Sequence, residues 1–458
     1  MDNRLFTDAP NRLGVVFFPA FDWAISPTHP EREERLLYTR DQLKEEGLFD
    51  IEGITEYRPE LASADDIRRV HFCLPSVSAV TTDSHMASAG GAITAARLVL
   101  ERRERKAFAL VRPPGHHSMR VVHGNRGFCN INNEAIMLAW IRDHYRRPDG
   151  RPLRFAIVDT DVHHADGSQD IFWNDPDTLF ISLHQDGRTL YPGTGFPREN
   201  GGPAALGRTV NIPLPPGTSD EGYLEIIEKV VLPILRDYKP DLVINSAGQD
   251  NHFTDPLANE QLSAQGYAAL NARLDPDIAV LEGGYSIRGA LPYVNMGICL
   301  ALAGLPATDI REPDWTPEST RQYSDVTSYI RRIQDRVLDV YFNPPSHPTE
   351  GSEVNGFWTR RKHIFYDTDY IQENQVESWA LCPDCRGLGV IETASSRVSR
   401  SLCLLIPRGA CPRCRAMAKE REAMARRGST YAFVLTVDED ANPVKNPKPW
   451  PLEDKQWL

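Results

Sequence analysis

The chain has 458 residues, which is too long for one compact core, so we expect two domains or one large α/β domain with an appendage. Apolar residues make up 41%, aromatic residues 9% and charged residues 25%, which excludes a collagen-like, coiled-coil or wholly disordered protein. The net charge of −12 opposes binding of the molecule as a whole to nucleic acid or anionic membrane.

The cellular location is predicted from three features. No apolar stretch approaches the roughly 18 residues that a spanning helix needs, and residues 1–12 lack the basic-then-apolar order of a signal peptide. Four of the eight cysteines form two CxxC pairs, a pattern typical of metal binding in a reducing compartment. We therefore expect a cytoplasmic protein without a membrane partner.

Residues 1–306 have the pattern of one α/β domain. Helical stretches and the apolar run LGVVFF precede residue 106, and short apolar runs then alternate with amphipathic stretches as far as residue 305. The runs KAFALV, RFAIVD, TLFISL, DLVINSA and DIAVLE lack polar alternation, as strands buried on both faces of a sheet do. The sequence predicts a doubly wound fold, with a parallel sheet and helices on both faces.

Composition changes after this region. Residues 307–354 are rich in turn-forming residues (DIREPDWTPEST, YFNPPSHPTEGSEVNG), so we expect a linker and peripheral segments there. Residues 355–458 are expected to form a separate C-terminal module.

Polar residues follow the predicted buried strands. In a doubly wound sheet the ligand site lies beyond the carboxyl ends of the strands. There the sequence has RPPGHHS, DTDVHHADG, GQDNH and EGGYS, each directly after a buried run. These segments are therefore expected to meet at one edge of the sheet.

Asp161, His163 and Asp250 offer two carboxylates and one imidazole, which leaves a fourth coordination position open, as in catalytic zinc sites. A D-x-H pattern alone is weak, because an Asp at a strand end is often a helix N-cap. Further polar residues in the same segments strengthen the interpretation: His116, His117, Asp159, Asp166 and Tyr285.

The order of the motifs resembles that of the zinc-dependent histone deacetylase family. The matching segments are SPTHPEREERL, RPPGHHS, GFCNINNEAI, VDTDVHHADGSQDIF, ISLH with YPGTG, SAGQDNHFTDPL and LEGGYS, over approximately residues 12–305. The resemblance implies an arginase/deacetylase-like α/β fold and zinc-dependent hydrolysis of an N-acyl amine.

The resemblance implies metal ligands at individual positions. Asp161, His163 and Asp250 match the family's catalytic zinc ligands, whereas Ala165 and His252 stand where a dimanganese arginase-type site would need carboxylates. A mononuclear site is therefore favoured. The resemblance also implies a potassium site, formed by Asp159, Asp161, His163, Ser182 and Leu183.

Catalytic roles follow from the same resemblance. His117 is expected to be the general base and His116 to stabilise charge, with Asp166 and Asp159 as their respective carboxylate partners. Tyr285 is expected to donate a hydrogen bond to the developing oxyanion.

The substrate tunnel is predicted from three positions. Phe128 and Tyr191 match the family's aromatic walls, although the second is usually Phe, so that Tyr191 adds a hydroxyl. Leu257 stands where polyamine-deacetylating members have an acidic gatekeeper. An apolar side chain cannot neutralise a second ammonium group, so acyl-lysine in a protein or peptide is favoured over acetylpolyamine.

The C-terminal module has its own metal-binding pattern. Two CxxC knuckles, Cys382 with Cys385 and Cys411 with Cys414, predict one structural zinc ion. GVIETASS and SRSLCLLIP are expected to be strands, RAMAKEREAMARR a basic helix and YAFVLTV a closing strand, which together suggest a zinc ribbon. Cys403 is expected to be a buried strand residue and not a ligand.

Two roles are open for this module. Residues 397–427 carry nine Lys or Arg against two Glu, which favours contact with nucleic acid or an acidic partner. A structural or protein-interaction role is the alternative.

The sequence as a whole predicts a zinc-dependent lysine deacetylase or deacylase. The alternatives are a small-molecule amidohydrolase such as an acetylpolyamine deacetylase and a scaffold protein.

Overall fold

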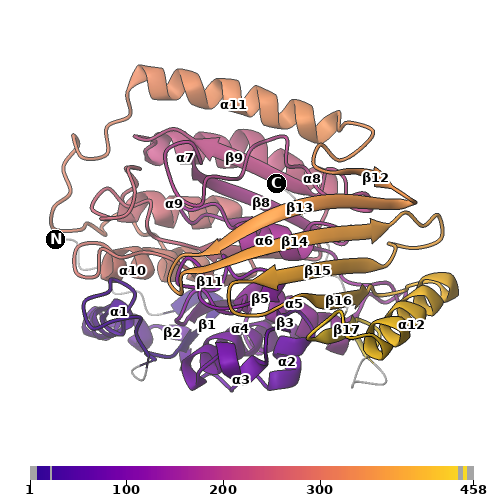
Figure 1. Ribbon diagram of the computed structural model, residues 1–458. Coiled ribbons are helices and arrows are strands. Elements are labelled where there is room, and N and C mark those ends of the chain that lie inside the picture. Colours follow the sequence, from indigo (N-terminus) through magenta and orange to yellow (C-terminus); the bar gives the residue numbers. More distant parts are fainter. Residues whose placement is uncertain (1–7, 21–22, 442–446, 451–458) are drawn as a thin grey trace.

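The computed structural model describes residues 8–20, 23–441 and 447–450 (Figure 1). The first seven residues of the expected domain 1–306 and the last eight of the expected module 355–458 lie outside these ranges. Within the described ranges, no helix has both the length and the apolar character needed to cross a membrane.

An eight-stranded sheet forms the centre of the larger domain, and all its neighbouring strands are parallel. The strands, in spatial order, are β2 (Glu52–Tyr57), β1 (Asp8–Phe17), β4 (Lys106–Leu110), β11 (Ile278–Leu281), β10 (Leu242–Ala247), β7 (Phe155–Asp159), β8 (Thr178–Gln185) and β9 (Thr209–Leu214). The predicted parallel sheet of buried strands is confirmed. The edge strands β2 and β9 were not anticipated.

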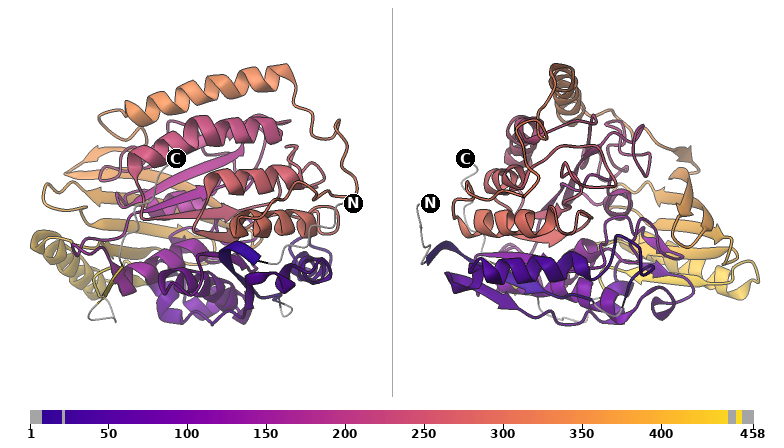
Figure 2. Two further views of the ribbon diagram at one scale, coloured as in Figure 1. Left: turned by 180° about the vertical axis from the view of Figure 1, so that it is seen from behind. Right: turned by 90° about the vertical axis from the view of Figure 1, so that its left-hand side faces the viewer.

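Helices cover both faces of this sheet, as predicted (Figure 2). On one face lie α1 (Glu34–Glu45), α7 (Asp220–Ile226), η2 (Ile227–Val231), α8 (Leu232–Tyr238), α9 (Ala264–Leu274) and α10 (Leu291–Ala303). On the other lie α2 (Ala64–Arg68), α3 (Val77–Val80), α4 (Asp83–Leu100), α5 (Asn133–His144) and α6 (Asp166–Phe172). Side chains of β7 alternate between the two cores, because Ala156 and Val158 join the first and Phe155 and Ile157 the second.

The remaining short elements of this domain are η1 (Leu48–Asp50), β3 (Phe72–Cys73), β5 (Val121–Val122), β6 (Tyr145–Arg146) and β18 (Lys448–Pro449). Residues 307–354, expected to be linker and peripheral segments, contain the amphipathic helix α11 (Ser324–Phe342). Its buried residues Ile330 and Val337 extend the first core beside β9 and α7.

The C-terminal part forms a second sheet of six strands. They are, in order, β12 (Ser352–Val354), β13 (Phe357–Tyr366), β14 (Ile371–Ala380), β15 (Gly389–Ser395), β16 (Ser401–Ile406) and β17 (Val434–Asp438). The predicted strands β15, β16 and β17 and the predicted basic helix, α12 (Pro412–Arg427), are all present. The long β13–β14 hairpin was not anticipated.

Both faces of the second sheet are covered. Helix α12 packs on one face, around Leu404 and Ala418. The opposite face packs on the larger domain (Figure 2, right). There Trp379 and Ile391 belong to one apolar cluster with Val121. The second sheet is therefore fused to the first domain through an apolar interface.

A buried ion-pair network ties the segment before α1 to the turn after β11. Glu31 is fully buried and binds Arg35 at 2.8 Å and Arg112 at 3.0 Å. Arg35 also donates to the carbonyl oxygens of Gly284, at 2.7 Å, and Glu282, at 2.5 Å. Burial raises the pKa of Glu31, but the guanidinium groups of Arg112 and Arg35 outweigh burial and hold its pKa below the ordinary value.

Replacing Glu31 with Gln should destabilise the protein by about 3–5 kcal/mol at pH 7, because two buried guanidinium groups lose their counter-ion. A depressed folded-state pKa gives stability that is fully present above the ordinary value of 4.5 and is lost as the pH falls through the folded value. The free energies of unfolding of wild type and Glu31→Gln, measured by chemical denaturation, should therefore become more similar as the pH falls below 4.5. The exposed Glu45→Gln variant is the control. If the difference in unfolding free energy between the two proteins stays constant down to acidic pH, Glu31 is not ionised in the folded protein and the interpretation is wrong.

Candidate active site

Four neighbouring strands bring polar residues to one edge of the sheet. In spatial order β4, β11, β10 and β7 run parallel, so their carboxyl ends lie together. The loops that follow them carry His117, Tyr285, Asp250 and Asp161, respectively. The site is thus built at the edge where doubly wound sheets bind ligands.

Asp161, His163 and Asp250 form a compact group, with one potential ligand atom from each within 4.8 Å of the others. His163 Nδ1 lies 3.2 Å from Asp161 Oδ1 and 3.0 Å from Asp250 Oδ2. Both carboxylates are fully buried. Backbone N–H groups orient them, since Gly283 donates to Asp161 Oδ2 at 2.8 Å and Val162 to Asp250 Oδ1 at 2.9 Å.

Two glycines make room for these carboxylates. A Cβ atom at Gly283 would overlap Asp250 Oδ2, and one at Gly248 would overlap Asp161 Oδ2. Gly284, with φ +121°, turns the chain toward Tyr285. The glycines therefore allow backbone to pack directly on the buried acids.

The donor set of this group fits a zinc ion. Two buried carboxylates and one imidazole concentrate negative charge at one point and offer the N and O ligands that zinc accepts in catalytic sites. His252 instead bonds to Thr254, at 2.9 Å, and to Glu312, at 3.2 Å. The imidazole of His252 is thus bonded to neighbouring segments and not to this group.

The paired histidines each contact the carboxylate that the resemblance assigned to them. His116 Nδ1 lies 3.2 Å from Asp159 Oδ2, and His117 Nδ1 lies 2.9 Å from Asp166 Oδ1. The two imidazole centroids are 4.2 Å apart. Both rings are buried beside the group of Asp161, His163 and Asp250, and His116 Nε2 lies 3.8 Å from Asp161 Oδ1.

The environment of His117 favours its neutral form. Burial, with the neighbouring His116, lowers the pKa of His117 to about 3. Burial also raises the pKa of Asp166, but Arg126 outweighs it and holds that pKa well below the ordinary value. An ionised Asp166 accepts the Nδ1–H of His117, which leaves Nε2 as the basic nitrogen.

Tyr285 is positioned by a hydrogen bond from its backbone N–H and by contacts of its ring. Its N–H donates to Asp255 Oδ2 at 2.7 Å, and its ring lies 5.5 Å from Phe128 and 4.9 Å from the Arg35 guanidinium carbon. Burial raises the pKa of Tyr285 well above its ordinary value. The phenol therefore stays protonated and can donate a hydrogen bond.

The predicted wall residues lie beside this group. The Phe128 ring packs edge-on against Tyr285, and the Tyr191 ring centroid lies 5.2 Å from that of His117. Leu257 is half-buried, and its N–H donates to Asp255 Oδ1 at 3.0 Å. Asp255 thus links the positions of Leu257 and Tyr285.

The residues matched to a potassium site lie at the carboxyl ends of β7 and β8. Asp159 and Ser182 are register partners, and the Ser182 hydroxyl lies 2.9 Å from His184 Nδ1. Leu183 follows in the buried strand. Potassium binding at this point stays a prediction.

Three residues of the site were not identified from the sequence. Glu282 accepts hydrogen bonds from the N–H groups of Gly115, at 2.7 Å, and His116, at 3.1 Å. Asp255 accepts the Tyr285 N–H, and Arg126 binds Asp166 through its two terminal guanidinium nitrogens, Nη1 at 2.8 Å and Nη2 at 2.6 Å. Glu282 and Asp255 lie within the matched motifs and could have been found there. No spacing signal marks Arg126.

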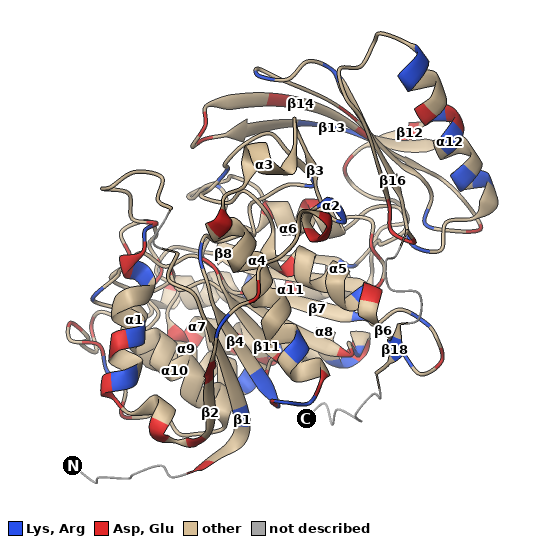
Figure 3. Ribbon diagram, turned by 90° about the horizontal axis from the view of Figure 1, so that it is seen from below, with Lys and Arg blue, Asp and Glu red and all other residues tan. Residues whose placement is uncertain are grey.

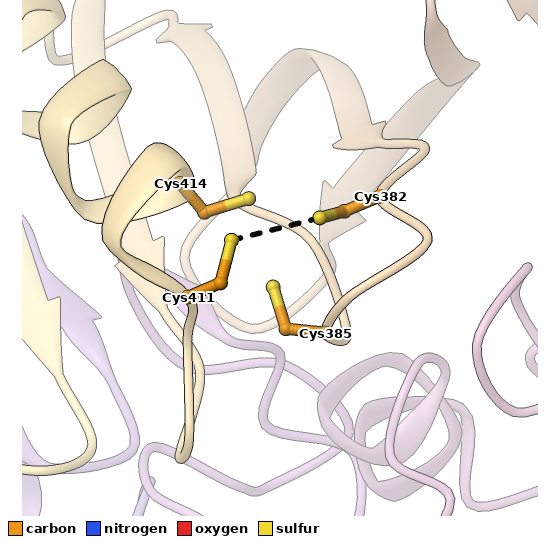
Figure 4. A group of neighbouring side chains, drawn as sticks. All are labelled: Cys382, Cys385, Cys411 and Cys414. Carbon is orange, nitrogen blue, oxygen red and sulfur yellow. Dashed lines mark hydrogen bonds between the residues drawn. The ribbon is translucent and has the colours of Figure 1, made fainter.

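The four knuckle cysteines converge as predicted (Figure 4). The sulfur atoms of Cys382 and Cys411 are 3.7 Å apart, and the Gly387 N–H donates to Cys385 Sγ at 3.4 Å. The backbone N–H of Asp384, together with Arg413, lowers the pKa of Cys382 to about 6, which favours a thiolate. All eight cysteines are described and none forms a disulfide. The group fits a tetrahedral zinc ion.

The basic segment 397–427 is partly neutralised by the protein itself. Helix α12 carries several basic residues on the outside of the molecule (Figure 3). Four of the nine basic side chains form ion pairs with residues that the structure describes: Arg400, Arg408, Arg415 and Arg426. Less positive charge is therefore available to a partner than the composition suggests.

The chain is similar to known deacetylases. Residues 75–296 match the family model of the histone deacetylase domain. A probable deacetylase of Archaeoglobus fulgidus is 45% identical over 356 residues, which are 71% of this chain and 96% of that protein. An acetylpolyamine amidohydrolase of Burkholderia pseudomallei is 37% identical over 186 residues, 40% of this chain and 52% of that protein.

A solved structure, that of the HDA15 HD domain, is similar with a TM-score of 0.60 at 28% identity, covering 72% of this chain and 97% of that structure. The chain belongs to the histone deacetylase family, whose members are zinc-dependent. It is accordingly an enzyme of the histone deacetylase type, with an arginase/deacetylase-like catalytic domain.

Replacing Cys382 with Ser should remove one zinc ion per chain, because three thiolates bind the ion more weakly than four. Elemental analysis of the purified protein is expected to give two zinc ions for wild type and one for the folded variant. Cys403→Ala is the matched control, since this buried cysteine lies in β16 outside the four-cysteine group. An unchanged zinc content in folded Cys382→Ser would contradict the structural site.

Proposed function

We propose that the enzyme hydrolyses N-acyl-lysine side chains in proteins or peptides. The observation that carries the proposal is a convergence at one buried point: the group Asp161, His163 and Asp250, the neutral imidazole of His117 and the protonated phenol of Tyr285. A protein that serves only as a scaffold has no need of this set. We therefore favour catalysis over the scaffold alternative.

The chain's own residues account for the proton transfers of amide hydrolysis. Zinc, when bound by Asp161, His163 and Asp250, supplies a Lewis acid and lowers the pKa of water. His117 Nε2 takes a proton from the attacking water and returns it to the leaving amine, while Asp166 holds its Nδ1–H. Tyr285 donates a hydrogen bond from its hydroxyl to the oxyanion that develops on the acyl carbonyl oxygen.

Preference for acyl-lysine rests on Leu257. This half-buried apolar side chain occupies the position where an acidic gatekeeper would select a second ammonium group. An acyl-lysine side chain carries no such second charge, so it enters an apolar rim without leaving a cation unpaired.

Acetylpolyamine is the second candidate substrate, and one observation favours it. Asp367, from the β13–β14 turn, accepts a hydrogen bond from the Tyr191 hydroxyl at 3.1 Å. This carboxylate contacts a predicted wall residue and offers a negative charge to a substrate ammonium group. A relative named acetylpolyamine amidohydrolase supports keeping this candidate.

A substrate panel separates the two candidates. Purified zinc-loaded enzyme is assayed on peptides carrying lysine with acyl chains of different lengths, and on acetylated polyamines. We expect chelator-sensitive turnover of the lysine peptides, and the best acyl chain defines the usable tunnel depth. Turnover of polyamines alone would overturn the lysine proposal, and no turnover of either class would overturn both candidates.

Replacing His117 with Ala should lower kcat by about 10²- to 10⁴-fold, the usual contribution of a general acid–base group. Steady-state kinetics checks the loss, and circular dichroism checks that the fold is retained. The control is His363→Ala, because His363 is exposed on β13 of the C-terminal sheet. Wild-type turnover in folded His117→Ala would contradict the assignment of the base.

A further inference from the structure

The C-terminal sheet reaches the catalytic loops through the turn of the β13–β14 hairpin. Asp367 Oδ1 accepts the Gly127 N–H at 2.9 Å, and Asp369 Oδ2 accepts the Asn125 N–H at 2.6 Å. A Cβ atom at Gly124 would overlap Asp369, so the loop packs directly on the turn. Two backbone groups of the loop 123–127 therefore depend on carboxylates from the other sheet.

The same loop is anchored at its start by His123. Its buried imidazole lies 3.1 Å from the Thr393 hydroxyl, 3.4 Å from Glu373 and 3.1 Å from the Ser395 hydroxyl. All three partners belong to β14 or β15. The loop is consequently held at both ends by the C-terminal sheet.

From this loop the contacts continue to the catalytic group. Arg126 forms the bidentate pair with Asp166, which in turn binds His117 at 2.9 Å. The Arg126 guanidinium also lies 5.4 Å from the Tyr191 ring centroid. A continuous set of contacts thus joins the hairpin turn to the candidate general base.

Asp367 touches the predicted tunnel wall directly. Its Oδ1 accepts the Tyr191 hydroxyl as well as the Gly127 N–H. Burial raises the pKa of Tyr191, so its hydroxyl acts as a donor. A half-buried phenol in an aromatic wall needs a polar partner, and Asp367 supplies it. Among the described residues, no Lys or Arg forms an ion pair with Asp367.

We propose that Asp367 is a positioning residue of the active site. By accepting the Tyr191 hydroxyl and the Gly127 N–H, it fixes one tunnel wall and the loop that delivers Arg126 to Asp166. The C-terminal module then helps to set the geometry of the catalytic pocket. The proposal rests on the proposed deacylase function for its kinetic test only.

The kinetic test compares three variants on the best substrate of the panel. Asp367→Ala should lower kcat/KM by about 10- to 100-fold, because two hydrogen bonds to a charged acceptor are lost. Asp367→Asn should stay within about 3-fold of wild type, since its amide oxygen accepts both bonds. In a Tyr191→Phe background, Asp367→Ala should cost less than it does alone, because one of its two partners is already gone.

Hydrogen–deuterium exchange gives a readout that needs no activity. Asp367→Ala should speed exchange of the amides in residues 123–127, and Asp367→Asn should not. Glu392→Gln is the matched control, because this acid pairs with Arg400 at the surface of the same sheet. If Asp367→Ala does not fold, Tyr191→Phe removes one of the same bonds from the other side and should change kcat/KM in the same direction.

Two outcomes would overturn the proposal. The first is unchanged exchange of residues 123–127 in Asp367→Ala. The second is a loss in Asp367→Asn that appears only as a higher KM for substrates with an extra positive charge, because Asp367 would then bind substrate instead of positioning the wall. If the wild type turns over no substrate, the deacylase proposal fails, while the exchange result still decides the role of Asp367.

Discussion

Buried carboxylates at the ends of three adjacent strands are the constraint on which this structure depends. Asp159 ends β7, Asp250 follows β10 and Glu282 follows β11, and all three are fully buried. An ionised carboxylate in such a place is costly unless hydrogen bonds or cations compensate it. Backbone N–H groups, imidazole rings and a site that fits a divalent cation together supply that compensation. The backbone donors include Asp161 to Asp159, Val162 to Asp250 and Gly115 to Glu282, and Gly283 leaves room for the backbone to pack against Asp250.

Much of this could be predicted from the sequence, and for a simple reason. Strands buried on both faces must be continuously apolar, so β4, β7, β8, β10 and β11 are visible as runs, and the residues directly after them must meet at one edge. Segments without such a pattern were not predicted. Helix α11 lies within a turn-rich stretch. Strand β14 alternates in burial, but its buried positions include Glu373, Gln375 and Glu377, so no apolar alternation marks it in the sequence.

Two of the missed residues share a cause that does not apply to Glu282 and Asp255, which lie within the matched motifs. Arg126 and Asp367 contribute through contacts between segments that are far apart in the chain, and no local spacing reports such contacts. The hydroxyl of Tyr191 appeared as an unexplained departure from the usual Phe. Its partner, Asp367, lies 176 residues away and became apparent only when the second sheet was in place.

Charge explains how the second sheet lies on the first domain. Lys362 contacts Asp170, Arg386 approaches Asp175 at 3.4 Å and Arg408 lies 3.1 Å from Asp143, each pair joining a basic group of the module to an acid of the catalytic domain. Acids of the catalytic domain thus neutralise part of the positive charge of the C-terminal region. These ion pairs lie at the interface between the two sheets, which also contains the apolar contacts of Trp379 and Ile391.

The hairpin also imposes an order of assembly. A ribosome releases Gly127 long before Asp367, which lies 240 residues further along the chain. The parallel sheet and its helices can bury their apolar faces during this interval, but the loop 123–127 still lacks the acceptors for its N–H groups. The pocket is therefore completed last, when the end of the chain folds back over a domain that was made first. Until residue 367 has been synthesised, the Gly127 N–H lacks this acceptor.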